Sequence, residues 1–132
     1  MPNQNEKKMK ILLAEDDTFL AGIYAAKFEQ AGFTVVLAAD GEAGLKAAQK
    51  ELPDIILLDI LMPKMDGFEV LENLKKNDKT KSIPVILLTN LGQREDVDKG
   101  LKLGAVDYLI KAHFMPHETV EKVKKVIAAT AK

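Results

Sequence analysis

The sequence contains no cysteine and no tryptophan, and only 5 % of its residues are aromatic. The absence of cysteine excludes disulfides, thiolate metal sites and cysteine nucleophiles. No apolar run approaches the roughly 20 residues that a membrane-spanning helix needs, and the polar start of the chain lacks the apolar core of a signal peptide. The net charge of -1 gives no reason to expect a nucleic acid as a direct partner. We therefore expect a cytoplasmic protein that binds neither membrane nor nucleic acid directly.

The composition that remains is that of one globular domain. The chain has 132 residues, of which 47 % are hydrophobic and 30 % are charged, enough to form a single hydrophobic core. It contains no internal repeat and no low-complexity linker. We expect a flexible tail at residues 1–8 and one domain at residues 9–132. The sequence leaves open whether this domain stands alone or was cut from a longer protein.

Short apolar runs alternate along the chain with longer segments of helical periodicity. The runs predict strands at Lys10–Ala14, Thr34–Ala38, Ile55–Leu58, Val85–Thr89 and Val106–Ile110. The other segments predict helices near Thr18–Gln30, Gly41–Glu51, Gly67–Asn77, Gln93–Leu103 and Pro116–Ala129. This alternation predicts an α/β fold, with a parallel sheet, right-handed crossovers and helices on both faces.

Polar side chains follow most of the predicted strands. Asp59 ends the run Ile55–Leu58, and Glu15 and Asp16 follow the first strand. Open α/β sheets bind their ligands at the carboxyl ends of the strands. Neighbouring strands lie about 4.8 Å apart, so carboxylates at adjacent strand ends can share one cation. Thr89 and Lys111 end two further strands, and the lysine has about the reach to lay its ammonium across to Asp59.

Each of these residues also has a simpler interpretation when taken alone. Asp17 is best read as the N-cap of the helix that follows it, and Asp66 as the start of another. A single aspartate such as Asp59 after a strand is more often a turn or cap residue than a catalytic one. His113 and His117 have no neighbouring ligand set, which favours exposed positions. Only the combination of Asp16, Asp59, Thr89 and Lys111 makes a chemical site the better interpretation.

The whole set resembles one family. The acidic pair Glu15-Asp16, the block from Asp59 through Met62-Pro63 to Asp66-Gly67, and then Thr89 and Lys111 occur in the order and spacing of a bacterial two-component response-regulator receiver domain. The resemblance spans residues 10–129. It implies a flavodoxin-like, doubly wound, five-stranded parallel sheet of order 2-1-3-4-5 with five helices, which places Asp16 and Asp59 on neighbouring strands.

The resemblance also implies a phosphorylation site and a metal site. Asp59 would accept a phosphoryl group from the phosphohistidine of a sensor histidine kinase or a phosphotransfer protein. Asp16, Asp59 and the backbone carbonyl of Leu61 would bind Mg²⁺ directly, and Glu15 would bind it through water. Oxygen ligands plus retained waters suit magnesium.

Three further residues receive roles from the resemblance. Thr89 would donate a hydrogen bond to the phosphoryl group, and Lys111 would pair with its charge. Tyr108 would follow Thr89 inward and change the face formed by the fourth helix, fifth strand and fifth helix. A downstream protein partner, or a missing output domain, would read that change. Tyr108 taken alone reads as a half-buried packing residue.

The chain departs from the family pattern at two places. Alanine at 112 replaces the usual proline after Lys111; a cis bond to alanine costs about 3–4 kcal/mol, so we expect either a trans bond with a rearranged loop or a strained cis bond. Asn90 is larger than the usual alanine or serine and should narrow access to Asp59. Leu61 and Leu91 are poor at orienting an attacking water, which predicts a comparatively long-lived aspartyl phosphate.

Two rival functions remain open at this point. A phosphatase of the haloacid type would need Asp-x-Asp after the first strand, and Glu15-Asp16-Asp17 does not fit that pattern. A phosphorylation-independent, receiver-like interaction module is the second rival. The main hypothesis is a regulatory domain and not an enzyme, limited to self-phosphorylation from small phosphodonors and slow autodephosphorylation. We expect its partner surface near Lys99, Lys102, Tyr108 and Lys122.

Overall fold

The protein folds as alternating strands and helices, in a computed structural model that describes residues 8–90, 94–111 and 115–130. The strands are Lys10–Ala14 (β1), Thr34–Ala38 (β2), Ile55–Asp59 (β3), Val85–Thr89 (β4) and Asp107–Ile110 (β5). The helices are Thr18–Gln30 (α1), Gly41–Glu51 (α2), Gly67–Lys76 (α3), Arg94–Lys102 (α4) and Pro116–Thr130 (α5). Within the described residues, none of these helices combines the length and apolar character that crossing a bilayer requires. Residues 1–7 of the predicted tail lie outside the described part.

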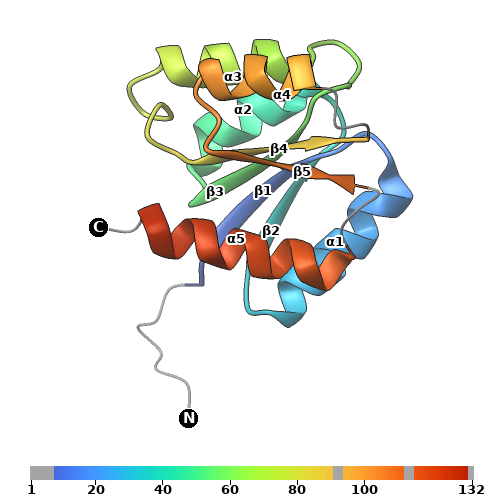
Figure 1. Cartoon of the computed structure of the whole chain (residues 1–132). Helices are drawn as coiled ribbons and strands as arrows, with labels where there is room; N and C mark the ends of the chain where they lie inside the picture. The colour runs from blue at the N-terminus through green and yellow to red at the C-terminus, as the bar shows by residue number, and fades with distance from the viewer. Residues whose placement is uncertain (1–7, 91–93, 112–114, 131–132) are drawn as a thin grey trace.

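The strands form one parallel sheet in the order β2-β1-β3-β4-β5. Helices α1 and α5 cover one face, and α2, α3 and α4 cover the other (Figure 1). This doubly wound arrangement confirms the predicted α/β fold and the strand order that the family resemblance implied. The carboxyl ends of all five strands therefore meet at one edge of the sheet.

The element boundaries differ from the predicted ones by one residue at a few ends. Strand β3 includes Asp59, because this residue pairs in register with Leu88 and the next N–H, of Ile60, donates to the Leu88 carbonyl at 3.1 Å. Strand β5 begins at Asp107 and not at Val106, since the pairing with β4 starts at Asp107 opposite Ile86. Differences of this size are usual where a ladder begins or ends.

The sheet separates two apolar layers. Alternate residues of β1 and β3 point to opposite faces, so Leu12, Ile56 and Leu58 pack under α2 and α3. Their neighbours Ile11 and Leu13 pack under α1 and α5 together with Tyr24 and Phe28. Every residue of β3 and β4 is buried, which is why these strands read as continuous apolar runs in the sequence.

Helix caps fix where the chain turns back at the carboxyl edge. The Asp17 carboxylate accepts the Leu20 N–H at 3.0 Å, and the Asp66 carboxylate accepts the Glu69 N–H at 2.9 Å. Both are N-caps, as predicted, and each satisfies an amide that the first helical turn leaves without a partner. The caps hold the β1–α1 and β3–α3 connections beside the polar residues of the sheet edge.

Candidate functional site

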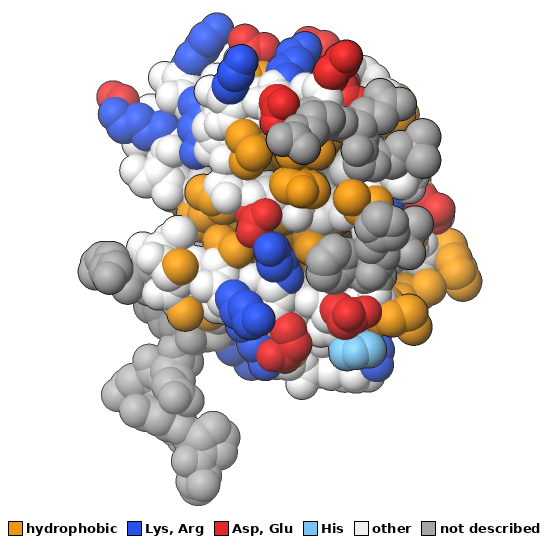
Figure 2. All heavy atoms as spheres, viewed as in Figure 1, with side chains coloured by type: hydrophobic (Ala, Val, Ile, Leu, Met, Phe, Trp, Pro, Cys, Tyr) orange, Lys and Arg blue, Asp and Glu red, His pale blue; other side chains and the backbone are white. Residues whose placement is uncertain are grey.

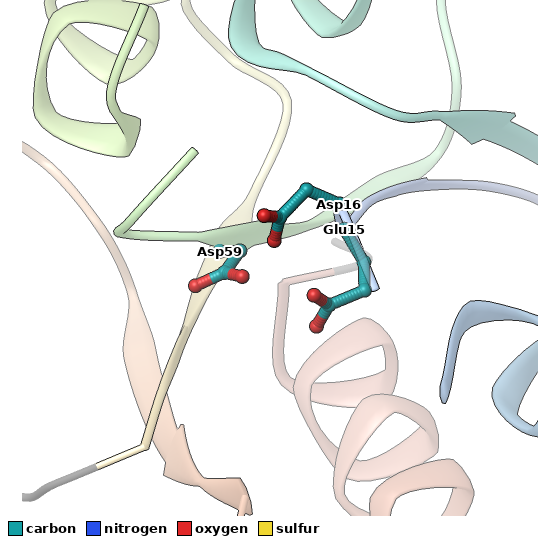
Figure 3. A group of neighbouring side chains, drawn as sticks. All are labelled: Glu15, Asp16 and Asp59. Atoms are coloured by element: carbon teal, nitrogen blue, oxygen red, sulfur yellow. The ribbon is translucent and has the colours of Figure 1, made fainter. Parts of the chain in front are cut away.

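Three carboxylates gather where β1 and β3 end. Glu15 and Asp16 follow β1, and Asp59 is the last residue of β3 (Figure 3). One carboxylate oxygen from each lies within 4.8 Å of the others. Glu15 and Asp59 are buried, whereas Asp16 is exposed and directs its carboxylate toward Asp59. The sheet order thus brings together acidic residues that are 43 to 44 positions apart in the chain.

Lys111, directly after β5, supplies the opposing charge. Its ammonium donates to Oδ2 of Asp59 at 2.9 Å. It also forms an ion pair with Oε1 of Glu15, an oxygen that has no hydrogen-bond partner of good geometry among the described residues. The lysine side chain is almost fully buried in this position. The Lys111 ammonium therefore lies between two buried carboxylates. Its contact with Asp59 agrees with the prediction that the lysine side chain is long enough to reach this aspartate.

The burial of this cluster changes the acidity of its members. Burial is the largest influence on Glu15 and, with the nearby Asp59 charge, raises the pKa of its carboxyl to about 7, although Lys111 and the Asp17 N–H oppose the shift. Burial alone would lower the pKa of Lys111, but its contacts with Glu15 and Asp59 outweigh that cost and raise it. Lys111 thus stays charged, while Glu15 changes its charge near neutral pH.

The phosphoacceptor candidate Asp59 is also held by backbone. Its Oδ1 accepts the N–H of Leu61 at 3.2 Å. The Gly67 N–H donates to the Ile60 carbonyl at 2.8 Å and draws the start of α3 against β3, so closely that a Cβ on Gly67 would lie 2.4 Å from the Asp59 carbonyl oxygen. The Leu61 side chain is 73 % exposed, so the β3–α3 loop and not side-chain packing places the Leu61 carbonyl.

The remaining predicted residues lie on β4 and β5. Thr89 is buried at the end of β4, beside the strand that carries Asp59, and Asn90 after it is exposed. Tyr108 pairs in register with Leu87, which puts it on the same sheet face as Thr89. Tyr108 is 37 % exposed and so partly buried, which agrees with the half-buried packing residue that the sequence alone suggested. The Lys111–Ala112 bond, Leu91 and His113 lie outside the described residues, so the predictions made on them stay predictions.

Sequence reasoning missed one acidic residue at this edge. Asp40 follows β2, where no polar group was assigned to the site, and it caps α2 by accepting the Ala43 N–H at 2.8 Å. It also lies 3.7 Å from the ammonium of Lys64, in the β3–α3 loop. An Asp-Gly pair before a predicted helix is the same cap signal that identified Asp66. The contact with Lys64 has no local signal, because the two residues meet only after folding.

Comparison with known proteins decides the family. The model of the response regulator receiver domain matches residues 11–124, which is most of the chain. The chain belongs to the receiver-domain family of response regulators. The receiver domain is 38 % identical over 121 residues to the DNA-binding dual master transcriptional regulator RpaA of Synechocystis, covering 92 % of this chain and 50 % of that protein. It is 37 % identical over 118 residues to the alkaline phosphatase synthesis transcriptional regulatory protein PhoP of Bacillus subtilis, covering 89 % and 48 %.

Solved receiver structures show the same fold. The receiver domain of Francisella response regulator 1452 aligns with a TM-score of 0.84 at 34 % identity, over 93 % of this chain and 99 % of that one. The chemotaxis protein CheY4 of Vibrio cholerae aligns with a TM-score of 0.85 at 30 % identity, over 91 % and 99 %. The chain spans about half the length of the curated relatives it matches but nearly the full length of these single-domain structures.

The donor set of this receiver domain fits the magnesium ion that is typical of its family. Carboxylate and carbonyl oxygens are the ligands that Mg²⁺ prefers, and it keeps several waters instead of requiring a full protein cage. Glu15, Asp16 and Asp59 offer three such oxygens within reach of one another. The exposed position of Asp16 leaves one side of the group open to solvent, where the retained waters of the ion can be accommodated.

Proposed function

We propose that this receiver domain is a phosphorylation-controlled switch in which Asp59 accepts a phosphoryl group from the phosphohistidine of a sensor histidine kinase or phosphotransfer protein. The observation that carries the proposal is the meeting of three carboxylates and Lys111 at the carboxyl edge of the sheet. A cluster of solvated acidic residues would need no buried lysine, and a structural ion pair would need no third carboxylate. A two-component phosphoacceptor site needs both the buried lysine and the three carboxylates.

The residues would divide the work as follows. An oxygen of the Asp59 carboxylate attacks phosphorus, the phosphorus–nitrogen bond to the donor imidazole breaks, and the imidazole nitrogen keeps that electron pair. Glu15, Asp16, Asp59 and the Leu61 carbonyl would hold Mg²⁺, which supplies charge neutralisation for the transferred group. Lys111 already lies 2.9 Å from Asp59, so it can follow the added negative charge. The hydroxyl group of Thr89 would donate a hydrogen bond to another phosphoryl oxygen.

We propose that a partner binds the face formed by α4, β5 and α5. Figure 2 shows hydrophobic side chains gathered there around a few charged ones. Leu101, Val106 and Tyr108 are its exposed apolar residues. Lys122 on α5 lies 2.8 Å from Asp107 on β5 and joins the two elements. Inward movement of Thr89 and Tyr108 would alter this face, and the partner would be a protein or an output domain like those of the longer relatives.

Phosphoryl uptake tests the proposal directly. Incubation with acetyl phosphate and Mg²⁺ should add 80 Da to the intact protein, as measured by mass spectrometry, and the same reaction on Asp59→Ala should add nothing. Asp54→Ala is the matched control, because Asp54 lies at the opposite end of β3, where it accepts the Lys10 N–H, and it should leave uptake unchanged. Absence of uptake by the natural sequence would favour the phosphorylation-independent module instead. Turnover of small phosphoesters would revive the phosphatase.

A slow loss of the phosphoryl group is a separate expectation at the same site. The exposed Leu61 side chain stands beside the acceptor and has no polar atom with which to orient a water molecule. Replacing it by glutamine should shorten the lifetime of the phosphorylated protein several-fold. This is less than the roughly 100-fold or more that a general base contributes, because an amide can orient a water molecule but does not accept its proton. The check is the decay of the 80 Da adduct with time at constant pH. An equal or longer lifetime in Leu61→Gln would contradict this expectation.

A further inference from the structure

The start of α2 touches the loop that carries the Leu61 carbonyl. The Gly41 N–H donates to the Pro63 carbonyl at 3.4 Å, and a Cβ on Gly41 would lie 1.7 Å from the Met65 carbonyl oxygen. No real Cβ approaches an oxygen so closely, so only glycine allows α2 and this loop to meet at this distance. Gly41 itself is buried by the contact.

Two further features hold the β3–α3 loop in the same place. Lys64 has a φ of 69°, a left-handed conformation that costs a residue with a Cβ roughly 1 kcal/mol or more. Its ammonium lies 3.7 Å from Asp40, the residue before Gly41. Met62 and Met65 are partly buried against the core beneath α2 and α3. The loop thus keeps a strained conformation because α2 and the core define its position.

One turn further along the same face, α2 rests on β1. A Cβ on Gly44 would lie 3.3 Å from the Cβ of Ala14 and 3.9 Å from that of Ala38. Ala14 is the last residue of β1 and directly precedes Glu15 and Asp16. Helix α2 is therefore in close contact with both halves of the acidic site, the β1 end through Gly44 and the β3–α3 loop through Gly41.

From these contacts we infer that Gly41 and Gly44 are positioning residues, and that α2 sets the distance between the β1 carboxylates and the Leu61 carbonyl, and so the affinity for Mg²⁺. The inference rests on the proposed function for the identity of the ion. The exposed Leu61 side chain cannot fix its own carbonyl, whereas the close contact of Gly41 with Met65 holds the loop against α2. An added methyl group at either glycine therefore changes the spacing of the ligands without removing any of them.

Calorimetric titration of the metal-free protein with MgCl₂ at pH 8 tests this inference. Gly41→Ala should bind Mg²⁺ about 10-fold or more weakly, the usual scale for a lost supporting contact at a metal site. Gly44→Ala should weaken binding by a few-fold, because its neighbours must move by only a few tenths of an ångström. Gly22→Ala in α1, where an added Cβ has nothing within 4 Å, is the matched control and should bind as the natural sequence does.

Urea unfolding without metal should accompany each titration to show that the variants are folded. If Gly41→Ala does not fold, Gly44→Ala decides, since alanine favours a helix interior over glycine by about 1 kcal/mol. Natural-sequence affinity in the folded glycine variants would overturn the inference and leave the proposed function intact. A natural sequence that gives no Mg²⁺ binding would overturn the proposed metal site itself, and with it this inference.

Discussion

Lys111→Met should lower the free energy of unfolding by about 3–5 kcal/mol at pH 8 in metal-free buffer. The lysine is the ion-pair partner of both Glu15 and Asp59, so its removal leaves Asp59 buried without its cation and takes from Glu15 the contact that opposes the rise of its pKa. The methionine retains most of the volume, so the loss reports charge and not packing. Urea unfolding followed by circular dichroism measures the effect.

Two controls make this result specific. Lys122→Met breaks another ion pair, with Asp107 at 2.8 Å, but one that is about a third exposed, and it should cost no more than about 1 kcal/mol. Added Mg²⁺ should restore part of the stability of Lys111→Met, because an ion that binds only the folded state stabilises it. Equal losses in the two variants would show that the site lysine does no more than a surface ion pair.

Glu15→Gln should make the metal-free protein more stable at pH 8, by about 2 kcal/mol. The pKa of Glu15 is raised from 4.5 to about 7, so the folded state binds its proton more tightly than the unfolded state does. The stability this provides is fully present below pH 4.5 and is lost as the pH rises to about 7. The shift corresponds to roughly 3 kcal/mol, and glutamine recovers less because it can keep only one of the two acceptor contacts of the carboxylate.

Unfolding curves at pH 4.5, 6 and 8 without metal test the sign. The difference between Glu15→Gln and the natural sequence should be small at pH 4.5 and grow toward pH 8. Glu51→Gln, at a partly exposed pair with Lys10, is the control and should change the free energy of unfolding by no more than about 1 kcal/mol. A difference that is largest at acidic pH would mean that Glu15 is stabilised as a carboxylate, contrary to the burial seen here.

The elements of the fold could be predicted from the sequence because their patterns are local. Strands β3 and β4 are buried throughout, and their sequences are continuous apolar runs. The capping residues Asp17 and Asp66 indicate where the next helices begin. The order of strands has no such local pattern. Apolar periodicity says that β1 is in the sheet but not that it lies between β2 and β3, so that information came from the family resemblance.

The site was predictable in its members but not in its electrostatics. Glu15, Asp16, Asp59 and Lys111 each end a strand, which is enough to place them at one edge. By strand alternation Glu15 and Lys111 lie on the face of the sheet that α1 and α5 cover, so the burial of Glu15 and its pairing with Lys111 depend on the whole fold. The meeting of Asp40 and Lys64 likewise depends on the turn of the β3–α3 loop, where a lysine adopts a conformation that its residue type does not favour.

The three carboxylates and one ammonium of the site leave a formal charge of −2 when all are ionised. A phosphodonor brings a phosphoryl group that is itself negatively charged, so it meets repulsion of like charges in the metal-free pocket. A divalent cation cancels the charge of the pocket. We therefore expect a compulsory kinetic order, in which the cation enters first and the phosphodonor second. The rate of phosphoryl uptake should then saturate with Mg²⁺ concentration at every donor concentration, whereas raising the donor alone should not replace the ion.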